Sequence, residues 1–139
     1  MTRSTRSVLI QCLAALTGLV LLVIGIRFLL VPQKAAQFFG IAPAAADAAI
    51  ALSYVIGLRD IWLALLVLVL SAVEDWRGLA LWLGLGAAVC LGDAAIAASS
   101  SGRPLSVGFH LASGLYCGVL ALTCWRQHGA QAAANPAID

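Results

Sequence analysis

Residues 53–65 read SYVIGLRDIWLAL, so Arg59 and Asp60 stand side by side inside a long apolar run. The run extends from about Ala48 to Ser71, which is long enough for a helix to cross a bilayer. An ionisable side chain near the middle of such a helix costs at least about 2.5–3.5 kcal/mol on insertion scales. The rest of the chain must therefore provide protein or water partners for Arg59 and Asp60.

Composition places the whole chain in a membrane. Of its 139 residues, 63% are hydrophobic and 10% are charged, and the mean hydropathy is +1.02. About a quarter of the residues of a soluble domain are charged. The net charge of +2, with no basic run, excludes a nucleic-acid partner. We expect a small integral membrane protein built as one bundle.

The hydrophobic pattern predicts an all-α bundle of four transmembrane helices with short loops. The expected spans are residues 8–31, 44–71, 78–98 and 105–125. Pro32 ends the first span, and Gln33–Gly40 is expected to be a short interfacial helix. A charged turn with an interfacial tryptophan, Trp76, should join the second span to the third. The bundle is expected to cover residues 1–128, followed by a disordered tail over residues 129–139.

Basic residues indicate the orientation. The first apolar run is longer than the core of a secretory signal and lacks a cleavage site, so we expect it to remain as a helix. With the N-terminus inside, more Lys and Arg fall on the cytoplasmic side than on the opposite side. We therefore expect a multi-pass protein of the cell (inner) membrane with both termini in the cytoplasm. The residues counted on the cytoplasmic side are Arg3, Arg6, Arg77 and Arg126, against Lys34 and Arg103 on the opposite side, with Arg27 near that edge.

Four polar residues of three different spans should lie at similar depth. At about 1.5 Å per residue, Arg59 and Asp60 lie roughly 17–18 Å from the inner face, and Asp93 and His110 roughly 22 Å. Small residues accompany them at helical spacing, which lets membrane helices approach closely. We expect Arg59 to pair with Asp60 or Asp93, and the second carboxylate to bond His110.

This cluster suggests acid–base chemistry on a lipophilic small molecule. Asp60, Asp93 and His110 are candidate catalytic acids or bases, and Arg59 is a candidate cation for a carboxylate or a developing oxyanion. Isomerisation or hydrolysis would suit these groups. We expect a cavity that touches His110 and at least one of the two aspartates, with Phe38–Phe39 as its lid. Candidate ligand-contacting residues are Tyr54, Trp62, Ser113 and Cys117.

Two other classes of function stay open. The cluster could only brace four helices, which would make the chain a structural or accessory subunit. A proton-coupled transporter fits less well, because the first span contains Arg27 and no acidic residue. No cofactor or metal is expected: His110 is the only histidine in a span, and Arg59 already satisfies the carboxylates. A homo-oligomer also stays open.

The four cysteines are expected to be packing residues. They lie in apolar runs and form no Cys-x-x-Cys pair, which argues against a thiol-redox enzyme and against a disulfide scaffold. They are Cys12, Cys90, Cys117 and Cys124.

Three motifs carry a resemblance to a known family. They are Gly57-Leu58-Arg59-Asp60 in the second span, Gly92-Asp93-Ala94 in the third and Gly108-Phe109-His110 in the fourth. With the segments 28–32 and 39–41, they resemble a family of small four-helix integral membrane proteins filed as a domain of unknown function. More distantly, the organisation is similar to DoxX-like membrane proteins. The resemblance implies a four-helix fold with a polar core and brings no activity.

Overall fold

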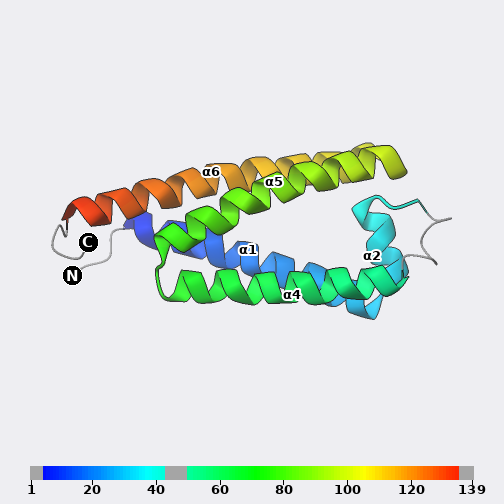
Figure 1. Ribbon diagram of the computed structural model, residues 1–139, viewed down its shortest axis with the longest axis horizontal. Helices are drawn as coiled ribbons and strands as arrows, with labels where there is room; N and C mark the ends of the chain where they lie inside the picture. Colours follow the sequence, from blue (N-terminus) through cyan, green and yellow to red (C-terminus); the bar gives the residue numbers. More distant parts are fainter. Residues whose placement is uncertain (1–4, 43–49, 135–139) are drawn as a thin grey trace.

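The computed structural model describes residues 5–42 and 50–134, and these residues form five helices and no strand (Figure 1). Four of the helices are long and apolar enough to cross a membrane. The predicted all-α fold with four candidate spans is thus confirmed, whereas the expected start of the second span at residues 44–47 lies outside the described residues. The helices are α1 (Thr5–Leu30), α2 (Pro32–Phe39), α4 (Ile50–Ala72), α5 (Trp76–Ser100) and α6 (Pro104–Ala134).

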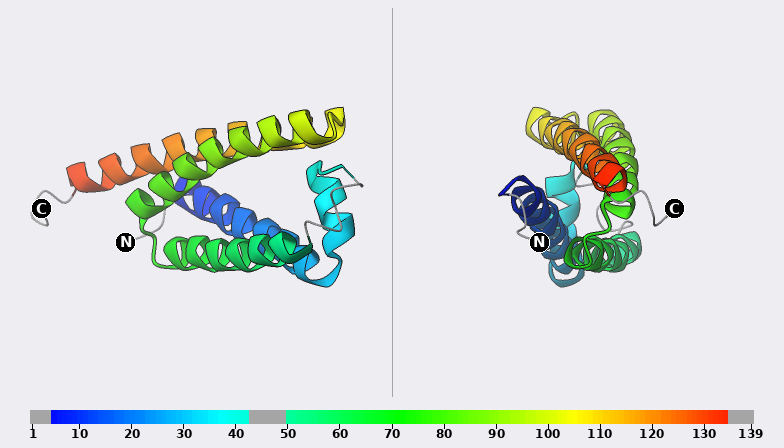
Figure 2. Two further views of the ribbon diagram at one scale, coloured as in Figure 1. Left: turned by 45° about the vertical axis from the view of Figure 1, so that its right-hand side comes forward. Right: turned by 90° about the vertical axis from the view of Figure 1, so that its left-hand side faces the viewer.

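The long helices form two pairs. Helix α1 packs along α4, and α5 packs along α6, while contacts between the two pairs are sparse. Figure 1 shows the pairs diverging toward the end where α2 lies, and the left view in Figure 2 agrees. Helix α1 begins and α6 ends at the opposite end of the bundle.

Glycines bring α1 and α4 into close contact. A Cβ atom added at Gly25 would lie 2.8 Å from the carbonyl oxygen of Gly57, and one added at Gly57 would lie 2.8 Å from the carbonyl oxygen of Gly25. No side chain fits at such a distance from a backbone atom. Small residues at an interface are what allows membrane helices to pack this closely. The absence of a side chain at Gly57 therefore allows α4 to pack directly against α1.

Two apolar clusters fill the ends of the bundle. The larger contains Ile10, Val67, Leu79 and Cys124, each from a different long helix. The smaller surrounds Phe28 where α1 meets α2. The polar positions of α4, α5 and α6 fall between these clusters along the helices.

Trp76 corrects one expectation. Its side chain is only 2% exposed and belongs to the larger cluster, so it does not face the membrane interface. It is the first residue of α5, whose N-cap is Asp75, with the carboxylate accepting from the Gly78 backbone N–H at 2.9 Å. This cap satisfies a backbone donor that the helix leaves free. The turn directs the indole inward.

The short helix α2 begins and ends as its sequence suggests. Pro32 occupies its first turn, and Gly40 closes it in the left-handed conformation with φ of 116°. A Cβ atom at Gly40 would also lie 2.7 Å from the Cβ atom of Ala97 on α5. The end of α2 thus rests against α5. At the other terminus, α6 continues to Ala134, past the expected domain boundary at residue 128.

Candidate functional site

Arg59 and Asp60 form an ion pair within α4. The Nε and Nη2 atoms of Arg59 donate to Oδ1 of Asp60 at 3.1 and 3.0 Å. Asp60 is 5% exposed, whereas the Arg59 side chain is 49% exposed. The expected pairing of Arg59 with one of the two aspartates is confirmed, with Asp60 as the partner. Because both residues belong to α4, their pair ties no two helices together.

The motif explains this arrangement. Asp60 follows Gly57 by three residues, so both lie on the face of α4 that packs inward, and both are buried. Each residue of an α-helix is rotated by about 100° from its neighbour. The Arg59 backbone therefore lies on the flank of α4, and its long side chain bends so that the guanidinium reaches the buried Asp60 carboxylate.

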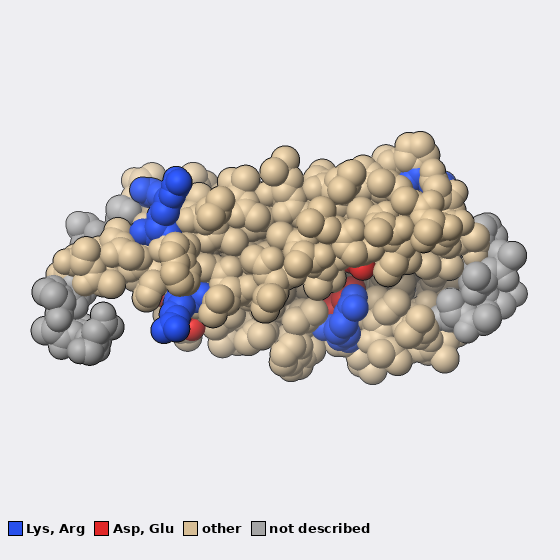
Figure 3. Space-filling view, turned by 45° about the horizontal axis from the view of Figure 1, so that its top comes forward, with Lys and Arg blue, Asp and Glu red and all other residues tan. Residues whose placement is uncertain are grey.

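Asp93 lies within electrostatic range of Arg59 and Asp60. It is half-buried on α5 and interacts electrostatically with both Arg59 and His110. Asp60 also experiences the charge of Asp93. Arg59, Asp60, Asp93 and His110, called the polar layer below, thus interact through their charges; that these four residues form a common site stays a prediction. Within the described residues, the Asp93 carboxylate makes no hydrogen bond or ion pair. Figure 3 shows acidic and basic groups close together right of the centre of one face, with further charged groups toward its two ends.

His110 bonds a different partner from the one expected. Its Nε2 atom lies 3.0 Å from the carbonyl oxygen of Phe39, which can only accept, so Nε2 carries the proton. Its ring also packs against the Phe39 ring, with centroids 4.6 Å apart. The expectation that His110 bonds a carboxylate is therefore wrong for Nε2.

The hydrogen bond from His110 is one of three that hold the end of α2. Arg103 Nη1 donates to the Gln37 carbonyl oxygen at 3.3 Å, and Ser106 Oγ donates to the Phe38 carbonyl oxygen at 3.0 Å. These carbonyls belong to the last turn of α2, which has no partners within its own helix. Sequence reasoning missed this role, although residues 103, 106 and 110 follow the spacing of one helical face.

The candidate ligand-contacting residues lie in different surroundings. Tyr54 and Trp62 are exposed on α4, and Ser113 is half-buried on α6. Cys117 is 7% exposed and belongs to the larger apolar cluster. Contact of these four residues with a ligand stays a prediction.

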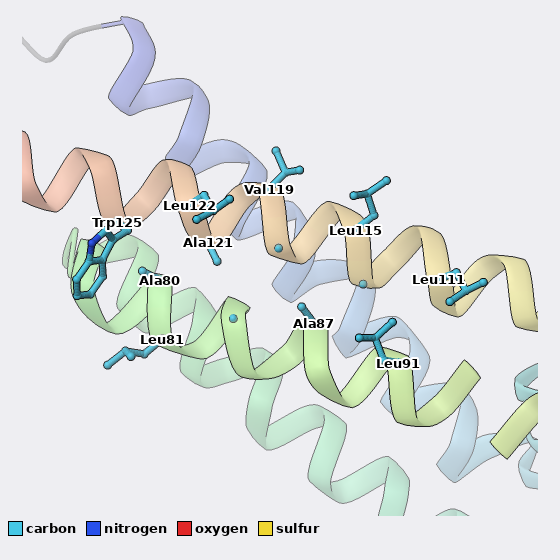
Figure 4. Close-up of a pocket in the computed structure, with 13 residues that line it drawn as sticks. Ala80, Leu81, Ala87, Leu91, Leu111, Leu115, Val119, Ala121, Leu122 and Trp125 are labelled. Carbon is cyan, nitrogen blue, oxygen red and sulfur yellow. The ribbon is translucent and has the colours of Figure 1, made fainter. Parts of the chain in front are cut away.

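A groove of about 720 Å³ runs along the outer face of α5 and α6 (Figure 4). It is lined by small residues such as Gly84, Ala87 and Gly118, and by several leucines and Trp125. A second groove of about 250 Å³ lies beside Tyr116. Neither groove includes any residue of the polar layer, so the predicted cavity at that layer stays a prediction.

Residues 18–126 match the model of one protein family, described as Domain of unknown function (DUF4267). The match includes α4, α5 and the whole polar layer. No curated protein and no solved structure matches the chain.

Proposed function

Since this chain belongs to the DUF4267 family, whose description names no activity, we propose a function from the residues of the polar layer: the protein binds the polar end of a lipophilic small molecule between its two helix pairs. The observation that carries the proposal is Asp93, a half-buried aspartate that faces Arg59 and His110 without a hydrogen-bond partner among the described residues. An ionisable residue inside a membrane span is by default a candidate for function.

A bracing role does not account for the carboxylates. Asp60 is satisfied by Arg59 of its own helix, and a contact between adjacent residues cannot hold two helices together. Asp93 bonds no residue of another helix in the described part of the chain. Two acidic groups thus lie at a depth where each is costly, although among the described residues neither forms a hydrogen bond or ion pair between two helices.

The chemistry of the layer suits a hydroxyl or carbonyl group at the end of an apolar molecule. A guanidinium has five N–H donors, and only two nitrogens of Arg59 are bonded to Asp60. Its half-exposed remainder can donate to a ligand oxygen, while Asp93 can accept from a ligand hydroxyl. With His110 nearby, Asp93 can also exchange a proton with the ligand, as isomerisation or hydrolysis requires.

The sparse contacts between the helix pairs provide the route of entry. Packing is continuous within α1–α4 and within α5–α6, and the pairs meet mainly in the larger apolar cluster and through α2. A molecule dissolved in the bilayer can reach the polar layer between the pairs without separating either pair.

Mass spectrometry of the lipophilic molecules that copurify with the protein tests the proposal. We expect one species in near-stoichiometric amount in the wild type, and its loss in Asp93→Asn. Arg126→Gln, at an exposed position of α6 far from the layer, is the matched control and should retain it. Equal amounts in Asp93→Asn and in the wild type, with both proteins folded by circular dichroism, would refute ligand binding at Asp93.

One observation favours a structural role for His110, as distinct from the other three residues of the polar layer. Its Nε2 proton is committed to the Phe39 carbonyl, so the residue acts in the attachment of α2. His110→Gln keeps a side-chain N–H donor. If that variant retains both the copurifying molecule and the wild-type stability, His110 serves as an anchor for α2 and takes no part in chemistry.

A further inference from the structure

Two cysteines far apart in the sequence meet between α5 and α6. The thiols of Cys90 on α5 and Cys117 on α6 lie within hydrogen-bonding reach of each other. The helices are close at this level: a Cβ atom added at Gly114 would lie 3.3 Å from the Cβ atom of Cys90 and 3.4 Å from the carbonyl oxygen of Ala87. Cys117 lies one turn beyond Gly114 on the same buried face.

We propose that Cys90 and Cys117 form a reversible disulfide inside the membrane, which links α5 to α6 beside the polar layer. A disulfide requires Cβ atoms about 3.5–4.5 Å apart and Cα atoms no more than about 7 Å apart. Facing cysteines satisfy these limits only where two helices nearly touch. The missing side chain of Gly114 permits that approach next to Cys90.

The other two cysteines serve as internal controls. Cys12 is exposed on α1, and Cys124 is buried among apolar side chains at the far end of α6. In the described residues neither has a thiol partner. The inference therefore concerns one specific pair of the four cysteines.

The oxidant must dissolve in the bilayer, because Cys117 is buried and Cys90 is half-buried in membrane-spanning helices. We write the step with a membrane-permeable diazenedicarboxamide as the two-electron acceptor. One of the two thiols loses its proton and its sulfur adds to one nitrogen of the N=N bond, while the other nitrogen takes the proton. The sulfur of the second cysteine then attacks the first sulfur, and the S–N bond breaks. The hydrazine leaves with the second proton, so the two thiols have lost two electrons and two protons.

The disulfide would fix the spacing of α5 and α6 next to the candidate site. Asp93 follows Cys90 by about one helical turn, and His110 precedes Cys117 by about two. Oxidation would therefore fix the distance between α5 and α6 near Asp93 and His110, and reduction would allow that distance to vary.

The test uses the full chain in isolated membranes. After treatment with the diazenedicarboxamide, the protein is denatured, alkylated with a maleimide and analysed by intact-mass spectrometry. We expect the number of alkylated cysteines to fall from the four of the sequence to two in the wild type. The Cys12→Ser and Cys124→Ser double variant retains only the proposed pair, and its alkylated cysteines should fall from two to none. In the Cys90→Ala variant and in the Cys117→Ala variant, oxidant treatment should not lower the number of alkylated cysteines.

A chain that stays fully alkylated, or a disulfide that involves Cys12 or Cys124 or joins two chains, would overturn the proposal. If Cys90→Ala fails to accumulate, the double variant still decides, because it leaves the pair intact. Oxidised glutathione, which is charged and does not enter the bilayer, should oxidise the pair far more slowly. Equal rates with both oxidants would refute the location inside the membrane.

Discussion

The ion pair of α4 makes an asymmetric prediction about stability. Asp60 is 5% exposed and its short side chain cannot reach another environment, whereas the Arg59 side chain is long and 49% exposed. Arg59→Gln leaves an unpaired buried carboxylate. Asp60→Asn leaves a guanidinium that can turn toward water or the headgroups. Arg59→Gln should therefore be the more damaging of the two substitutions.

The structure suggests the size of each effect. Removing one partner of a buried ion pair costs about 3–5 kcal/mol, and the exposed half of Arg59 places its loss near the lower limit, at about 3 kcal/mol. Asp60→Asn keeps an oxygen that can accept from Arg59, so its cost should be about 1 kcal/mol. The double variant should cost less than the sum by about 1 kcal/mol or more, because it leaves no unpaired carboxylate at position 60.

Unfolding in mixed micelles, followed by tryptophan fluorescence and by circular dichroism, measures these free energies. Arg59→Gln with Asp93→Asn provides the comparison: Asp93 interacts with Arg59 through its charge and without a hydrogen bond among the described residues, so these two losses should be coupled less strongly than those of Arg59→Gln and Asp60→Asn. The reasoning fails if Asp60→Asn costs as much as Arg59→Gln. It also fails if Arg59 couples more strongly to Asp93 than to Asp60.

Three further predictions concern the fold. Gly57→Ala should push α1 away from α4 and lower the free energy of unfolding by about 1–3 kcal/mol, whereas Gly92→Ala, with no atom within 4 Å of the added methyl, should not destabilise the protein. Equal losses of stability in a denaturation experiment would contradict the close contact between α1 and α4 at Gly57. His110→Leu should speed amide exchange in α2 while His110→Gln largely preserves it, since removing a hydrogen bond costs about 1 kcal/mol, and unchanged exchange in both would rule out the anchor. Cysteines placed at Ser101 and Ala134, in a variant lacking the native ones, should react with an impermeant maleimide from opposite sides of the membrane; labelling from one side would exclude four spans.

Much of the architecture could be predicted because bilayer thickness and helix geometry act on contiguous residues. The long apolar runs sufficed for four spans, and Pro32 and Gly40 sufficed for the limits of α2. The Arg59–Asp60 pair could be predicted as one of two possible pairings, because adjacent residues of one helix have fixed relative directions. A charged side chain buried at this depth requires a partner, which made some pairing of Arg59 predictable.

Contacts between helices were harder, because they depend on axial register and rotation that no single segment encodes. The acceptor of His110 is a backbone carbonyl at the end of another helix, which has no signature in the sequence. The meeting of Cys90 and Cys117 likewise depends on how α5 and α6 align, and a search for closely spaced cysteines could not find it. Trp76 was expected at the interface from its position in a turn, but the direction of the turn decides where it points.

The division into two helix pairs has a consequence for cooperativity. Elements that pack continuously exchange their amide protons as one unit, and units that share few contacts open separately. The close contact of Gly25 with Gly57 should place the middle of α1 and α4 among the slowest-exchanging amides, while α2, held at its end by three side-chain hydrogen bonds, should open first. The polar layer lies on the boundary between the two units. A change in the separation of the units would therefore alter the water content and the charge balance of that layer while every transmembrane helix remained folded.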